Sequence, residues 1–238
     1  MLAKPVLNIC ANFAHTLLPQ DCLLCGAFSG RAKLCADCAA DLPCHPRACC
    51  PVCALPTLHG AICGHCLKRP PHFGSTRAAY TYAFPLDRLV QSLKYGHNLA
   101  VVSLLADALA AQAAKHPLPD ALIPMPLHPN RLRQRGFNQA HEIAQRIARI
   151  LRLPVLSHAT TRVIDTAPQA SLPLKQRRNN LRGAFACEHN LQGKRVAIVD
   201  DVMTSGSTLD ALAEVLLKAG ALEVQCWVVA RAVMQRNF

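Results

Sequence analysis

Residues 196–209 read VAIVDDVMTSGSTL, and this stretch decides the expected fold of the 238-residue chain. Its first four residues form a continuous apolar run, which is typical of a strand buried on both faces of a parallel sheet. Asp200 and Asp201 follow the run, and a loop rich in hydroxyl groups comes next. From Leu209 the apolar residues recur at helical spacing up to Gly220, in the position of a helix C-cap. The stretch therefore predicts a strand, a loop and a helix.

The loop at residues 204–208 has the composition of an anion site. A loop that enters a helix N-terminus directs backbone N–H groups and the positive end of the helix dipole at one point, where a phosphate can bind. Gly206 allows close approach of the anion, and hydroxyl groups flank it on Thr204, Ser205, Ser207 and Thr208. Carboxylates fit beside a phosphate if they accept hydrogen bonds from sugar hydroxyls, or if a divalent metal lies between them and the ligand. The combination suggests a ribose 5-phosphate, with Asp200 and Asp201 on its hydroxyls; an ordinary strand with a polar turn is the alternative.

VAIVDDVMTSGSTL resembles the phosphoribosyl pyrophosphate (PRPP) binding motif of type I phosphoribosyltransferases. Within that class, the chain is similar to the ComF family of competence-associated proteins, which includes GntX-type members. The resemblance implies PRPP and Mg²⁺ as ligands, and transfer of a phosphoribosyl group with loss of pyrophosphate. Purine-salvage phosphoribosyltransferases carry an Asp at the position of Thr204, so no acceptor nucleobase can be inferred for this chain.

The cysteines are concentrated before residue 67, where eleven of the thirteen lie. Eight of them form four Cys-x-x-Cys knuckles, namely Cys22 and Cys25, Cys35 and Cys38, Cys50 and Cys53, and Cys63 and Cys66. Each knuckle supplies two thiolates, and two knuckles complete a tetrahedral zinc site. Pairing in sequence order predicts two structural zinc ions, although crossed pairing is compatible with the spacing. A disulfide framework is the competing explanation, and it fits a secreted chain better than this one.

A basic stretch follows the next apolar run, residues 121–127, which predicts another strand. Residues 128–139 read HPNRLRQRGFNQ and place Arg131, Arg133 and Arg135 around a turn that ends at Gly136. Guanidinium groups bind phosphate oxygens with paired donors, so the turn predicts an anion site. The same residues resemble a ComF signature, and their position corresponds to the pyrophosphate loop of phosphoribosyltransferases. A solvated basic turn is the alternative.

A long polar segment, residues 162–182, carries a Lys175-Gln176-Arg177-Arg178 cluster and corresponds to the flexible catalytic loop of phosphoribosyltransferases. Among the residues that the resemblance implicates, we expect Asp200, Asp201, Arg135 and Lys175 to act in catalysis. The remaining apolar patterns predict strands at residues 80–84, 155–158 and 224–229. They also predict helices at residues 4–18, 85–95, 99–114 and 139–151.

These elements predict an α/β fold: a type I phosphoribosyltransferase-like, mostly parallel sheet flanked by helices, preceded by a small double zinc-ribbon domain. The change in composition at residues 68–71 places the boundary between residues 1–70 and 71–238. The chain lacks an 18-residue apolar run and the pattern of a signal peptide, so we expect a cytoplasmic protein that does not insert into membranes.

A second class of function is an accessory protein that binds single-stranded DNA or senses PRPP without catalysis. The resemblance supports it, because ComF proteins are associated with uptake and use of DNA; competence-machinery proteins are then further partners. The formal net charge of +12 suits either DNA or polyanionic PRPP. Aromatic residues make up only 5% of the chain, which leaves few stacking platforms for single-stranded bases.

Overall fold

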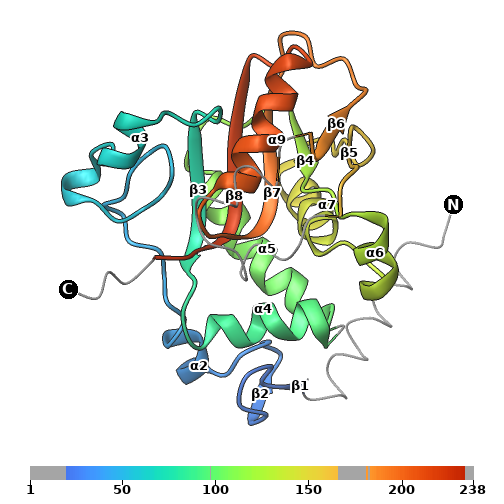
Figure 1. Ribbon diagram of the computed structural model, residues 1–238. Coiled ribbons are helices and arrows are strands. Elements are labelled where there is room, and N and C mark those ends of the chain that lie inside the picture. Colours follow the sequence, from blue (N-terminus) through green and yellow to red (C-terminus); the bar gives the residue numbers. More distant parts are fainter. Residues whose placement is uncertain (1–19, 97, 166–180, 182, 234–238) are drawn as a thin grey trace, which may run out of the picture.

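A four-stranded parallel sheet forms the centre of the computed structural model, which describes residues 20–96, 98–165, 181 and 183–233. The strand order is β3–β8–β7–β4 (Figure 1). The bounds are Ser75–Thr81 for β3, Glu223–Arg231 for β8, Arg195–Met203 for β7 and Ala121–Pro124 for β4. All three neighbouring pairs are parallel, so the expected mostly parallel sheet is confirmed.

Helices cover both faces of this sheet. One face packs against α4 (Leu86–Tyr95), α5 (Ala100–Ala113) and α7 (Gln139–Leu151), and the other packs against α9 (Ser207–Lys218). Successive side chains of a strand point to opposite faces. Accordingly, Ala197 and Val199 of β7 lie in the core beneath α4, α5 and α7, whereas Val196 and Ile198 lie in the core beneath α9. Burial on both faces explains why this strand is continuously apolar.

The cysteine-rich part of the chain packs against the sheet and helices in two places (Figure 1). The first place holds β1 (Gln20–Asp21), β2 (Phe28–Gly30) and α2 (Ala36–Ala40), and its Leu34 and Leu42 join the core that includes α4 and α5. The second holds the 3-10 helix η1 (Leu58–Gly60) and α3 (Gly64–Lys68). The predicted boundary at residues 70 and 71 stays a prediction.

The segment between the two cysteine-rich places runs along the outer edge of β3. The amide N–H of Thr81 donates to the Pro43 carbonyl over 2.8 Å, and that of Thr76 donates to the Pro51 carbonyl over 3.1 Å. The amide N–H of His45 returns a bond to the Ala79 carbonyl over 3.1 Å. An uncovered edge strand is a template for unwanted pairing, and these bonds occupy it.

Several expected elements have different bounds in the structure. The helices expected at residues 85–95, 99–114 and 139–151 are present as α4, α5 and α7. The strand expected at residues 80–84 is β3, which begins and ends earlier because it pairs with β8 from Ser75 to Thr81. The strand expected at residues 121–127 ends at Pro124, and the one expected at residues 155–158 is reduced to a single bridge from Val155 to Leu122.

The turn expected after β4 is a short helix, α6 (Pro129–Arg135). His128 Nδ1 accepts from the Asn130 amide, and Pro129 occupies the first turn, where its missing N–H costs nothing. Gly136 ends the helix in the left-handed region at φ 72°, which glycine adopts without strain. A short antiparallel pair, β5 (Thr160–Arg162) and β6 (Phe185–Cys187), completes the described elements.

The expected helix at residues 4–18 lies outside the described residues, as does most of the segment expected to form the catalytic loop. Within the described residues, none of the helices has the length and apolar character needed to cross a membrane.

Candidate functional site

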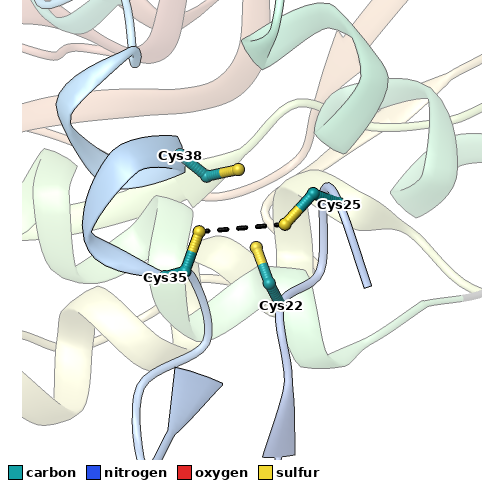
Figure 2. Close-up of side chains that lie close together, drawn as sticks. All are labelled: Cys22, Cys25, Cys35 and Cys38. Carbon is teal, nitrogen blue, oxygen red and sulfur yellow. Dashed lines mark hydrogen bonds between the residues drawn. The ribbon is translucent and has the colours of Figure 1, made fainter. Parts of the chain in front are cut away.

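The first four-cysteine cluster joins Cys22, Cys25, Cys35 and Cys38 (Figure 2). The Cys22 amide donates to the Ala27 carbonyl and the Gly26 amide to the Cys22 carbonyl, which folds the first knuckle; the second knuckle opens α2. The four Sγ atoms lie within 4.8 Å of one another, and those of Cys25 and Cys35 are 3.8 Å apart. Four sulfurs at about 2.3 Å from a tetrahedral zinc ion lie about 3.8 Å apart, so the cluster has the size of a zinc site.

The second cluster joins Cys50, Cys53, Cys63 and Cys66 with the same geometry. The Sγ atoms of Cys53 and Cys63 are 3.6 Å apart, and the Cys63 amide donates to Cys50 Sγ over 3.3 Å. The knuckles therefore pair in sequence order, and all eight thiols are free of disulfides. Four thiolates leave no open coordination position, which is typical of structural rather than catalytic zinc.

Backbone N–H groups favour the thiolate form in one cysteine of each cluster. Burial raises the pKa of Cys22, but hydrogen bonds from the backbone at Cys25 and Cys35 outweigh it and lower the pKa to about 6. Burial likewise raises the pKa of Cys50, and backbone bonds at Cys63 and Cys53 lower it to about 7. Burial raises the pKa of Cys53 to about 11 and also raises that of Cys66, and hydrogen bonds with neighbouring thiols raise the pKa of Cys38. These thiols would therefore need a bound cation to be held as thiolates, the metal-binding form.

Asp200 and Asp201 lie within β7, because the strand runs on to Met203 beyond its expected end at residue 199. Their consecutive positions in a regular strand direct them to opposite faces of the sheet. Asp201 is buried on the α4 side, where its Oδ2 lies 2.9 Å from Nζ of Lys94. Burial lowers the pKa of Lys94, but the attraction of Asp201 and Asp200 outweighs it and raises the pKa.

Asp200 lies on the α9 side of the strand and is partly exposed. Its partial burial and the neighbouring Asp201 carboxylate raise the pKa of Asp200 from 3.8 to about 7. Lys94, Arg162 and the Asp201 amide, which donates to Asp200 Oδ1 over 2.8 Å, oppose this increase. The negative charge of Asp200 is therefore less well compensated than that of Asp201. A ligand that donates hydrogen bonds to Asp200 would offset the repulsion between the two carboxylates.

The three arginines of α6 do not all lie on the same face of the helix. Helical periodicity places Arg131 and Arg135 on one side and Arg133 roughly 200° from Arg131. Arg131 Nε lies 3.7 Å from Asp165 Oδ1, and the Arg135 guanidinium stacks 5.5 Å from the ring centre of Tyr95. Arg133 donates to the Asn130 side chain over 2.5 Å. The helix thus brings two of the three predicted phosphate ligands to one face.

Arg162 and Asp165 extend the site beyond the residues that the motifs indicated. Burial and the charge of Arg131 lower the pKa of Arg162, while Asp200 and Asp165 oppose that shift, so Arg162 interacts electrostatically with both Arg131 and Asp200. Asp165 accepts from Asn130 Nδ2 over 2.9 Å, which lowers the pKa of its carboxyl group. Neither residue belongs to a recognisable motif. Lys94 was also missing from the predicted site residues, and the structure adds it through its ion pair with Asp201.

The predicted phosphate loop leads directly from β7 into α9. Gly206 occupies the N-cap of α9 at φ 81°, and its residue type provides no side-chain cap for the first helical turn. Ser205 Oγ accepts from the Ser207 amide over 3.3 Å and lies 3.0 Å from Ser207 Oγ. Thr204 is exposed and Ser207 and Thr208 are partly exposed, as an anion site requires. Lys175, the remaining predicted catalytic residue, lies outside the described residues.

Each part of the chain matches a known domain family. The phosphoribosyl transferase domain model matches residues 136–237, and the double zinc ribbon domain model matches residues 13–67. The DNA utilization protein YhgH of Escherichia coli O157:H7 is 38% identical over 191 residues, which cover 77% of this chain and 84% of that protein.

Two competence proteins are also similar to the chain. Competence protein F of Haemophilus influenzae is 38% identical over 179 residues, covering 71% of this chain and 78% of that protein. Competence protein ComFC of Bacillus subtilis is 26% identical over 211 residues, covering 84% and 85%. The fold and the matches define a phosphoribosyltransferase domain that follows a double zinc ribbon. Within that class, the chain belongs to the ComF family.

Because the two aspartates have different environments, we expect their substitution by asparagine to change the free energy of unfolding in opposite directions. Because the folded-state pKa of Asp200 is raised from 3.8 to about 7, its stabilising contribution is present at low pH and is lost as the pH rises through about 7. Asp200→Asn should therefore raise the free energy of unfolding at pH 8, on the order of 2 kcal/mol, with a smaller gain at pH 5. Urea unfolding at the two pH values measures both effects.

Asp201→Asn is the matched control, because it removes the carboxylate that pairs with Lys94. Leaving a largely buried ammonium without its partner should lower the free energy of unfolding by about 1–3 kcal/mol at pH 8. Equal destabilisation by both substitutions at pH 8 would contradict the assignment of Asp200 as the less compensated carboxylate.

Proposed function

We propose that this protein binds PRPP together with Mg²⁺ and transfers the phosphoribosyl group to an acceptor. The observation that carries the proposal is the carboxyl end of β7, where two aspartates lead through a hydroxyl-rich loop into a helix N-terminus. Ligands of open α/β sheets bind beyond the carboxyl ends of the strands. The membership in a family with a phosphoribosyl transferase domain supports the same ligand.

The 5-phosphate of PRPP would bind at the start of α9. Amides of the first helical turn have no partner within the helix and carry the positive end of the dipole. Hydroxyl groups of Thr204, Ser205, Ser207 and Thr208 donate the remaining bonds to the phosphate oxygens. Gly206 belongs at this position because φ 81° is strained for other residues and because its missing side chain leaves the amides accessible.

The ribose hydroxyls would donate to Asp200, the more exposed of the two β7 aspartates. Asp200 gains most from such donors, because hydrogen bonds to the ionised form offset the burial and repulsion that raise its pKa. Asp201 is buried on the other side of β7 and paired with Lys94, so it would act on the sugar mainly through the negative charge that it places beside Asp200. Mg²⁺ bound to the pyrophosphate would neutralise part of the ligand's charge.

The pyrophosphate group would face the basic side chains of α6, with Arg131 and Arg135 as the principal donors and Arg133 and Lys175 as further ones. In the transfer, the bond from the anomeric carbon to the pyrophosphate oxygen breaks, and pyrophosphate leaves with the electron pair. The acceptor forms a bond to the same carbon and loses a proton. The transition state has oxocarbenium character, so stabilising the charge of the leaving group is the main catalytic contribution of these residues.

The two cysteine clusters would each hold one structural zinc ion. The sulfur separations of 3.8 and 3.6 Å agree with tetrahedral zinc–thiolate coordination, and the match to a double zinc ribbon supports the same metal. The cysteine-rich segment forms only short elements, so bound metal would replace much of a hydrophobic core.

Metal analysis tests the zinc assignment. Protein purified without chelator should contain about two zinc ions per chain, because each cluster offers four thiolates. Elemental analysis by plasma mass spectrometry, combined with thiol titration in denaturant, measures both quantities. Metal-free protein that contains disulfides at these cysteines would overturn the assignment.

A thermal-shift titration tests the phosphate site. A ligand at 100 times its Kd adds about 2.7 kcal/mol to stability, so saturating PRPP with Mg²⁺ should raise Tm by about 5–10 °C in a protein of this size. Gly206→Ala should abolish most of this shift, because φ 81° disfavours alanine and the strain would change the backbone of the loop itself.

Gly193→Ala is the matched control for backbone strain. Gly193 has φ 72°, with nothing within 4 Å of an added Cβ, and it lies in the turn before β7 rather than in the phosphate loop. Its substitution should lower Tm slightly and leave the PRPP shift intact. Equal loss of the PRPP shift in both variants would argue against phosphate binding at residues 204–208.

A non-catalytic accessory role in DNA uptake is the second candidate function. Relatives of this chain are named competence and DNA utilization proteins, and the net charge of +12 favours binding of single-stranded DNA. PRPP would then act as a signal at the same site rather than as a substrate. Competence-machinery proteins are the partners that such a role requires.

Substitution of the α6 arginines separates the two functions. For a transferase, Arg131→Ala combined with Arg135→Ala should weaken Mg²⁺–pyrophosphate binding at least tenfold, because two guanidinium donors are lost. It should also slow pyrophosphate release from PRPP when a panel of nucleobases is supplied. Affinity for a single-stranded oligonucleotide should fall only through the loss of two charges, with a salt slope shallower by about 1.4.

The matched control removes two exposed charges outside the site, with Lys115→Ala and Arg149→Ala. It should reproduce the change in DNA affinity and leave pyrophosphate binding unaltered. A collapse of DNA binding that is specific to the α6 variant, with no pyrophosphate released by any nucleobase, would favour the accessory role.

A further inference from the structure

Arg231, the last residue of β8, is a buried arginine that joins the second cysteine cluster to the predicted phosphate loop. Its side chain is only 3% exposed. Nε donates to the Cys53 carbonyl over 2.7 Å. Nη1 donates to the Met203 carbonyl over 3.0 Å and also contacts the Thr204 carbonyl, at the point where β7 becomes the loop.

These bonds hold the guanidinium in one position. Burial lowers the pKa of Arg231, and only well-placed acceptors compensate a charge that has left water. The acceptors are main-chain carbonyls, including that of Ala232 at 2.7 Å, so the side chain fixes the path of three chain segments at once. One of those segments is the Cys50–Cys53 knuckle and another is the entrance to the phosphate loop.

A second set of contacts connects the same two regions. His72, which follows the second cluster in the chain, approaches Asp210 Oδ1 through its amide at 2.8 Å and through Nδ1 at 2.9 Å. Asp210 belongs to the first turn of α9. The buried Phe73 lies beneath the loop, with Cζ 3.8 Å from where a Cβ of Gly206 would stand. Residues of the second cluster and those that follow it therefore contact the predicted phosphate loop at its start, through Arg231, and at its end, through Asp210.

The first cluster has different neighbours. Lys33, between its two knuckles, donates to the Ala100 carbonyl at the start of α5 over 2.9 Å, and Cys22 joins the core beneath α4 and α5. The second cluster instead shares a core with Phe73, Met203 and Leu209. This difference makes the first cluster an internal control for the second.

We propose that Arg231 is a positioning residue for the phosphate loop, and that through it zinc at the second cluster and PRPP at the loop strengthen each other's binding. The proposal rests on the proposed function, because it takes the loop to be the phosphate site. Zinc fixes the knuckle whose Cys53 carbonyl orients Arg231, and Arg231 fixes the carbonyls of Met203 and Thr204. Such coupling is reciprocal: if bound zinc raises the affinity for PRPP by some factor, bound PRPP must raise the affinity for zinc by the same factor.

Cysteine alkylation of the full-length zinc-loaded protein tests the coupling. A zinc-selective chelator and iodoacetamide are added with and without PRPP and Mg²⁺, and mass spectrometry follows the labelling of each cluster. PRPP should slow the labelling of Cys50, Cys53, Cys63 and Cys66 about tenfold, within the range usual for coupled sites, and change the first cluster much less. In Arg231→Gln, calorimetric PRPP affinity should fall about tenfold and the selective protection should disappear.

Arg146→Gln is the matched control, since Arg146 makes paired bonds to Asp107 of 2.8 and 3.0 Å away from the loop. It should retain both the affinity and the selective protection. Unchanged PRPP affinity in Arg231→Gln, or equal protection of both clusters in the wild-type protein, would overturn the coupling and leave the proposed function standing. Failure of the wild-type protein to bind PRPP would instead overturn the proposed function, and the coupling with it. If Arg231→Gln does not fold, the wild-type protein alone tests the coupling: slower labelling of the second cluster than of the first in the presence of PRPP supports it, and equal labelling contradicts it.

Discussion

The carboxyl end of β7 holds two adjacent carboxylates beside the predicted phosphate loop, and compensating the negative charge of these carboxylates is the constraint on which the rest of the site depends. Because consecutive strand residues face opposite sides, one carboxylate needs a cation from α4 and the other needs a cation from the α9 side. Lys94 meets the first need directly, and Lys94, the Asp201 amide and Arg162 together meet only part of the second. Because the negative charge of Asp200 is only partly compensated, a hydrogen-bond donor such as a sugar hydroxyl would stabilise the ionised carboxylate.

The cysteine-rich segment belongs to the architecture of this site rather than to a separate appendage. Its linker occupies the edge of β3, its first cluster packs near α4, and its second cluster contacts Arg231 and the approach to α9. A knuckle folded by metal can hold a carbonyl in place without a large core of its own. The segment therefore contacts both the edge of the four-stranded sheet at β3 and, through Arg231, the predicted phosphate loop.

Local patterns were sufficient to predict the sheet, three of its helices, the four cysteine knuckles and the strand–loop–helix unit, whereas the spacing left the pairing of the knuckles open until the structure showed it. These features follow from periodicity, spacing and turn residues, which act over a few positions. Arg162, Asp165 and Arg231 could not be found in this way, because each acts through residues that are distant in the chain. Arg231 carried one faint signal, a charged residue that ends an apolar strand. The division of the α6 arginines between two faces was hidden because the stretch was expected to be a turn rather than a helix.

The central claim is that the carboxyl end of β7 and the start of α9 form a PRPP site. The most direct measurement is a crystal structure of the protein with PRPP and Mg²⁺ bound. The account predicts the 5-phosphate within hydrogen-bond distance of the amides and hydroxyls of residues 205–208, the ribose hydroxyls at Asp200, and the pyrophosphate on the side of Arg131 and Arg135. PRPP bound elsewhere, or bound with its pyrophosphate at the start of α9 and its 5-phosphate on α6, would contradict the account.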